Sequence, residues 1–134
     1  MGADEQEVAR PDFRSYRDLL VWQQAMALAE HCYRVKASFP KEEIYGLTAQ
    51  MRKSAVSIAA NIAEGHGRET VGAFVQFLRV AQGSLKELET HLLLASRVRC
   101  TSESEVEPVL ARCDDVGRML RSLIRSLQKK AETA

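Results

Sequence analysis

Residues 71–95 repeat an apolar side chain at alternating steps of three and four, and this spacing constrains the fold more than any other feature. The seam runs without interruption, and it is the spacing by which long antiparallel bundle helices interlock. Its members are Val71, Phe74, Leu78, Ala81, Leu85, Leu88, Leu92 and Ala95. We expect one helix from a Thr70 cap to about Val98, packed along this seam against other helices.

Two segments before it are also predicted to be helical. The first runs from about Tyr16 to Ser38 and ends at Phe39-Pro40, because the residue before a proline avoids helical geometry. The second begins between Glu42 and Thr48 and ends at Glu64-Gly65. The first segment has a stripe on one face formed by Leu19, Trp22, Met26, Ala29 and Tyr33; the second has a seam formed by Leu47, Met51, Ala55, Ile58 and Ile62.

A fourth helix follows the polar break at Cys100–Ser104. Either Ser102 with Glu105 or Ser104 with Glu107 forms its capping box, with Pro108 placed in the first turn, where proline is tolerated. Its inward stripe is Val109, Cys113, Val116, Leu120, Leu123 and Leu127. Helices joined by short turns lie antiparallel, so the chain is predicted to be all-α: an antiparallel up-and-down left-handed four-helix bundle at 15–130, between a flexible tail at 1–14 and a frayed C-terminus at 131–134.

The bulk composition excludes several classes of protein. With 134 residues, one domain can bury a core without disulfides, and the net charge of +1 gives no overall basic field. The three cysteines show no paired spacing, which argues against a disulfide framework and a zinc site. No signal peptide and no membrane-spanning run is recognisable, so we expect a cytoplasmic protein without a membrane partner.

No catalytic motif emerges from the sequence. Bundles that bind two irons carry Glu-x-x-His pairs, whereas Glu87 and His91 are four residues apart and occur once. Cys32 and Cys113 lie on or beside inward stripes, where packing explains them better than nucleophilic catalysis. We therefore expect no enzyme activity, no metal, no cofactor and no small-molecule substrate.

Two surface features remain. In the last helix, cations at steps of three and four lie opposite the apolar seam and form a basic stripe: Arg118, Arg121, Arg125 and Lys129. Such a stripe suits a phosphate backbone or an acidic partner, and a merely solvated face is the alternative. The second helix carries more apolar and small residues than one seam uses, at Val56, Ala59, Ala60 and Ala63.

That surplus predicts either self-association through these four residues or close packing within the chain. Beside the seam, a polar strip of Gln50, Ser54, Ser57 and Asn61 needs hydrogen-bond partners if it is buried, and Glu89 is one candidate.

Several segments together resemble a known family. They are Leu20–Ala25, Tyr45-Gly46-Leu47 with Gln50, Arg52–Ile58, Asn61–Gly65, Arg68, and Phe77-Leu78 through Gly83–Thr90. In this order they resemble the bacterial four helix bundle protein family, also called 23S ribosomal RNA intervening-sequence proteins. The resemblance covers about Tyr16 to Leu127.

The resemblance implies a small bundle that assembles into a homo-oligomer, a pentameric ring. Related proteins include the accessory variability subunit of diversity-generating retroelements, which forms a ring and binds a reverse transcriptase and nucleic acid. The resemblance assigns no catalytic residue to this sequence.

Two hypotheses follow for function. In the first, a non-enzymatic homopentamer binds RNA, DNA or a nucleic-acid-handling protein, with Arg52, Lys53 and Arg68 joining the Arg118–Lys129 stripe around the ring. In the second, a structural or adaptor oligomer recognises a protein and no nucleic acid, which the near-zero net charge favours.

Overall fold

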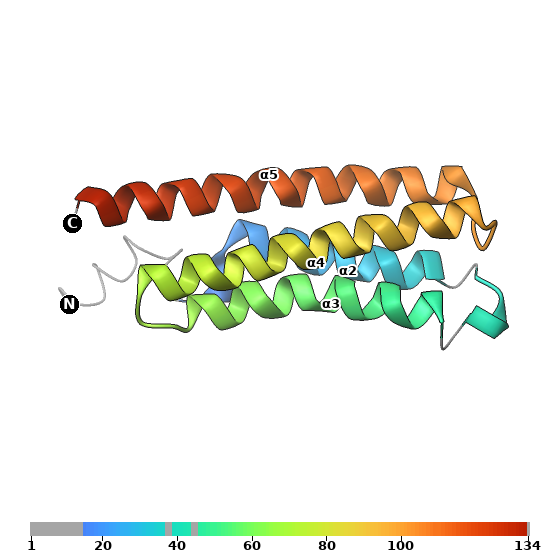
Figure 1. The fold of residues 1–134 in the computed structure, drawn as a ribbon, viewed down its shortest axis with the longest axis horizontal. Coiled ribbons are helices and arrows are strands. Elements are labelled where there is room, and N and C mark those ends of the chain that lie inside the picture. Colours follow the sequence, from blue (N-terminus) through green and yellow to red (C-terminus); the bar gives the residue numbers. More distant parts are fainter. Residues whose placement is uncertain (1–14, 37–38, 44–45, 134) are drawn as a thin grey trace.

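A computed structural model describes residues 15–36, 39–43 and 46–133, so the predicted tail at 1–14 lies outside the described residues. Within them the chain forms four long helices and two short 3-10 turns (Figure 1). The helices are α2 (Leu20–Lys36), α3 (Leu47–His66), α4 (Val71–Arg97) and α5 (Glu103–Thr133), and the turns are η2 (Tyr16–Asp18) and η3 (Lys41–Glu43).

Each helix packs against its neighbours in sequence, and α5 closes the bundle by packing against α2. Side-chain contacts show that α3 and α4 run in opposite directions, because Ser54 meets His91 and Ser57 meets Ser84. Together with the arrangement in Figure 1, this confirms the predicted all-α, up-and-down four-helix bundle.

The core is formed by one apolar row from each helix. In α4 the predicted seam is confirmed from Leu78 to Ala95, and in α3 from Met51 to Ile62. The α5 row is buried at Val109, Cys113, Val116 and Leu120 and continues through Ile124. Burial of these rows, at about 25 cal/mol per Å² of apolar area, is the main force that holds four separate helices together.

The first helix differs from its prediction in start and in orientation. It begins at Leu20 rather than near Tyr16, because the preceding residues form the 3-10 turn η2, which Ser15 caps by accepting a hydrogen bond from the Arg17 amide at 3.1 Å. Its buried row is Val21, Ala25, Leu28, Cys32 and Val35. The stripe expected from the sequence is therefore rotated, with Met26 and Tyr33 exposed at the boundary with α3.

Local hydrogen bonds set the ends of α4 and α5. The Thr70 hydroxyl accepts from the Ala73 amide at 3.1 Å, as predicted, and Ser102 rather than Ser104 caps α5 by accepting from the Glu105 amide at 3.2 Å. Since α5 starts at Glu103, Pro108 lies in its second turn, not its first, and α5 continues to Thr133, beyond the predicted fraying point.

At the other end of α4, Arg99 takes a left-handed conformation with φ 63°, and the Cys100 amide bonds back to Ala95 at 2.9 Å, which stops the helix.

Candidate oligomer and nucleic-acid interfaces

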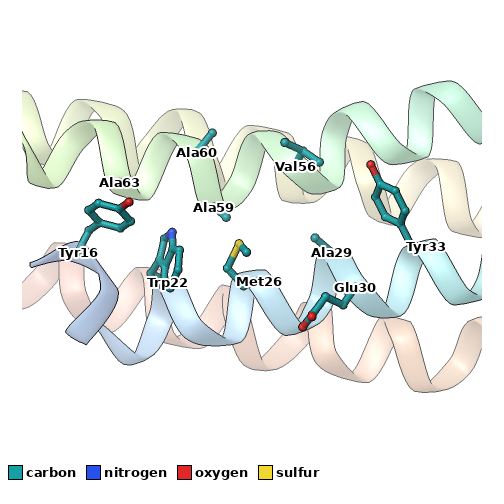
Figure 2. A pocket seen from close by; sticks show the side chains of 10 residues that line it. All are labelled: Tyr16, Trp22, Met26, Ala29, Glu30, Tyr33, Val56, Ala59, Ala60 and Ala63. Atoms are coloured by element: carbon teal, nitrogen blue, oxygen red, sulfur yellow. The ribbon is translucent and has the colours of Figure 1, made fainter.

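An apolar groove of about 610 Å³ runs between α2 and α3 (Figure 2). One wall comes from the large side chains of η2 and α2, and the other from the small side chains of α3. Among the described residues of the lining, Glu30 is the only charged one. The lining residues are Tyr16, Trp22, Met26, Ala29, Glu30, Tyr33, Val56, Ala59, Ala60 and Ala63.

The groove exists because α3 offers too little side chain to fill it. Ala59 of α3 faces α2 across the boundary, and in Figure 2 Trp22, Met26 and Tyr33 point from α2 towards α3. Tyr16 packs edge-on against Trp22, with ring centroids 5.2 Å apart, towards the end where α2 begins. Towards the other end, the Arg52 guanidinium lies 4.7 Å from the centre of the Tyr33 ring.

All four residues of the predicted oligomer surface line this groove. Val56 and Ala60 are exposed, Ala63 is half-buried, and Ala59 is buried beneath α2. The sequence does not predict the opposite wall of the groove. It places Trp22, Met26 and Tyr33 on one stripe and does not show whether that stripe faces the core or the surface. A second apolar row on the same helix faces the core, and it is the feature that would have shown the first row to lie at the surface. This second row is Val21, Ala25, Leu28 and Cys32.

The predicted basic stripe lies along the exposed face of α5. Arg118 forms an ion pair with Asp115 one turn earlier on the same helix. Among the described residues, Arg121, Arg125 and Lys129 are exposed and have no ion-pair partner. These three cations are therefore available to an external anion.

Beside the stripe, a second groove of about 420 Å³ separates α4 from α5. Arg118 and Arg121 line it together with Lys86, which pairs with Glu89 at 3.0 Å. Asp114 adds a second carboxylate to its lining. The surroundings of the stripe are thus mixed in sign and not uniformly basic.

The three other predicted cations lie apart from α5. Arg52 packs on Tyr33 beside the apolar groove, and its Nε atom is buried without a hydrogen-bond partner. Lys53 is exposed between α3 and α4, and Arg68 pairs with Glu64 at 3.2 Å while covering the Phe77 ring. One copy of the chain does not bring these residues to the α5 stripe.

Two residues of the α3 polar strip contact α4 at hydrogen-bond distance, and a third bonds within α3. Ser54 Oγ lies 3.1 Å from His91 Nδ1, Ser57 Oγ lies 2.7 Å from Ser84 Oγ, and the Asn61 amide donates to the Ser57 carbonyl at 2.8 Å. Glu89, the partner suggested from the sequence, pairs with Lys86 instead. The strip joins two helices through hydrogen bonds inside an otherwise apolar interface.

Ser54, His91 and Glu87 line a small pocket of about 120 Å³. A serine, a histidine and a carboxylate are the residue types of a hydrolytic triad. The Ser54 hydroxyl also lies 2.8 Å from the Gln50 carbonyl of its own helix. A hydroxyl has one proton, so the contacts are satisfied when Ser54 donates to Gln50 and His91 Nδ1–H donates to Ser54. In that arrangement the histidine does not act as a base towards the serine.

The described cysteines are buried thiols. Burial raises the pKa of Cys32 to about 12 and also raises the pKa of Cys113, so neither supplies a thiolate nucleophile near neutral pH. Among the described residues, no three His, Cys, Asp or Glu side chains gather as a metal-binding group. None of the described helices is both long and apolar enough to cross a bilayer.

The fold and these surfaces define a class of protein: a four-helix bundle with an exposed apolar groove on one side and a cationic helix face elsewhere. Residues 17–122 match the family model of the 23S rRNA-intervening sequence protein. The chain belongs to this family.

One solved structure is similar over 78% of this chain and 98% of its own, with a TM-score of 0.73 and 21% sequence identity. It is a protein of unknown function from the S23 ribosomal protein family of Bacteroides thetaiotaomicron VPI-5482, and the likeness shows the fold. None of the curated proteins compared with the chain matches it.

Proposed function

We propose that the protein is a non-enzymatic homo-oligomer, a pentamer, that binds nucleic acid in the cytoplasm. The observation that carries the proposal is the apolar groove between α2 and α3, lined on one side by Val56, Ala60 and Ala63. An apolar surface of this kind, with a tryptophan, a methionine and a tyrosine at its edge, marks an interaction site in a small protein.

The α5 stripe supports the nucleic-acid part of the proposal. Arg121, Arg125 and Lys129 recur along one face and lack ion-pair partners among the described residues, so they can contact phosphates without first breaking an ion pair. Several copies in one oligomer present the stripe repeatedly to a single polyanion, which raises avidity above that of one nearly neutral chain.

Salt-dependent binding to labelled structured RNA and duplex DNA tests this proposal. Replacing Arg118, Arg121 and Arg125 with Ala should weaken binding and reduce the slope of log affinity against log salt by about one per lost phosphate contact. The matched control replaces Arg34, Lys41 and Arg79, exposed cations on other elements, and should leave the slope close to that of the wild type. Equal slopes for the two triple variants would refute the role of the stripe.

A protein-adaptor oligomer is the second candidate, favoured by the acidic groups beside the stripe at Glu89, Asp114 and Asp115. If the wild type is an oligomer by light scattering but binds neither probe at low salt, the nucleic-acid proposal fails and the adaptor function is preferred. A partner retained from cell extract after nuclease treatment would then identify what the oligomer recognises.

A further inference from the structure

We infer that one copy of the chain inserts a patch on α4, formed by Leu93, Leu94, Arg97 and Val98, into the α2–α3 groove of the next copy, with Arg97 paired to Glu30. This inference deepens the proposed function, since it rests on the proposed oligomer and identifies the two surfaces that form it. The contact is heterologous, because the groove and the patch consist of different residues.

The distribution of exposed apolar side chains supports two distinct surfaces. Of the eight large apolar side chains exposed among the described residues, three line the groove: Met26 at 39%, Tyr33 at 41% and Val56 at 48%. Three others lie at the C-terminal end of α4, where Val98 is the C-cap residue: Leu93 at 50%, Leu94 at 46% and Val98 at 56%. Only Leu20 and Val80 fall outside the two surfaces.

The α4 patch forms a ridge that suits a groove. Arg97 follows Leu93 by four residues and Leu94 by three, and Val98 follows Leu94 by four, so these side chains share one face of the helix. The groove is a hollow between a wall of large side chains and a wall of alanines. Helices recognise one another in this way, by packing the ridge of one into the groove of another.

The charges of the two surfaces are complementary. Within the described part of the chain, Glu30 is the only charged residue that lines the groove, and it follows Met26 by four residues and precedes Tyr33 by three. The patch likewise contains one charge, Arg97, which lies one turn after Leu93 and Leu94 and directly before Val98. Neither Glu30 nor Arg97 has a hydrogen-bond or ion-pair partner within the described part of the chain.

The two surfaces lie on different sides of the bundle. The groove opens between α2 and α3, whereas α4 packs against α3 and α5 and presents the patch on its solvent face. A chain with both surfaces can accept one neighbour and insert into another. Repetition of that contact gives a closed ring where the rotation closes and a filament where it does not.

Charge reversal tests the pairing in the full-length protein. Glu30→Arg and Arg97→Glu each place like charges together in the contact, and each should raise the protein concentration needed for assembly by at least about a hundredfold. The double variant E30R/R97E restores opposite charges and should recover the mass of the wild-type assembly. Light scattering over a concentration series gives the masses, and circular dichroism checks that each variant is helical.

Arg79→Glu is the matched control, since Arg79 is exposed on α4 and lies outside the patch. It should assemble as the wild type does. If the wild type is oligomeric and the single reversals keep its mass, or if the double variant fails to recover what the singles lose, the pairing is overturned while the oligomer stands. A wild type that is monomeric throughout the series overturns the proposed oligomer as well.

Discussion

Gly65 shows at the residue scale why a glycine is needed inside the Asn61–Gly65 segment. A Cβ at this position would lie 2.7 Å from Phe77 Cβ and 3.2 Å from the Phe74 carbonyl oxygen. The first of these atoms is the base of a side chain and the second belongs to the backbone, so neither can move aside easily. The glycine therefore allows α3 and α4 to approach closely at the turn that joins them.

Gly65→Ala is expected to lower the free energy of unfolding by about 1–3 kcal/mol, the usual cost of overpacking, offset in part by the better helix propensity of alanine. Gly83→Ala is the matched control, because a Cβ there meets nothing within 4 Å and should stabilise α4 by about 1 kcal/mol. Denaturant unfolding measures both values. A Gly65→Ala protein as stable as the wild type would contradict the close approach.

At the scale of the helices, the sequence was informative where one apolar row is longer and more regular than any other row of the same helix. The α4 seam could be predicted from Leu78 to Ala95 because it is continuous, whereas the exposed apolar residues of that helix, Val80, Leu93 and Leu94, form no row of comparable length. In α2, two apolar rows lie side by side, and periodicity alone cannot tell which one faces the core. The groove could not be predicted from the sequence for the same reason, since its second wall is the outer row of α2.

The contact between α2 and α5 includes a hydrogen bond that depends on pH. Arg112 Nε donates to His31 Nδ1 at 3.0 Å, so this nitrogen must be unprotonated. Partial burial lowers the pKa of His31 below 6.5, and the charges of Arg112 and Arg34 lower it further, against a smaller opposing effect of Glu105. Protonation of His31 would break this hydrogen bond and place two cations, His31 and Arg112, next to each other.

We therefore expect His31 to make the bundle less stable in mild acid. Because the pKa in the folded protein is lower than in the unfolded chain, the stability linked to neutral His31 is present above pH 6.5 and is lost as the pH falls through the folded-state value. His31→Gln keeps an acceptor for Arg112 and should lose less stability between pH 7 and pH 5 than the wild type. Urea unfolding at the two pH values measures the difference, and His66→Gln, at the last residue of α3, is the control.

At the scale of the whole molecule, the apolar groove and the cationic face of α5 both lie outside the core. The packing that stabilises one copy of the chain therefore does not account for either surface. The sequence predicted the α3 wall of the groove from an excess of small residues and predicted the stripe from its spacing. It could not show that Arg52 packs on Tyr33 beside the groove, because that contact joins two helices.

Ala60→Arg tests the groove independently of the surface that fills it. Ala60 is exposed in one copy and lines the groove, so an arginine there is accommodated by the monomer but places an unpaired charge in any contact made through this surface. We expect the assembly to dissociate at concentrations where the wild type stays associated, as measured by light scattering. Ala111→Arg, on the exposed side of α5, should leave the mass unchanged; an unchanged mass for Ala60→Arg would place the interface elsewhere.

The closure of the bundle by α2 and α5 has a consequence for how the chain folds. The contacts of α3 with α2 and α4, and of α4 with α5, join helices that are adjacent in sequence, so each closes a short loop at little entropic cost. The α2–α5 contact joins the two ends of the chain and closes the longest loop. We expect rapid formation of the three hairpins between successive helices, with the first and last helices docking in the final step and separating first when the protein unfolds.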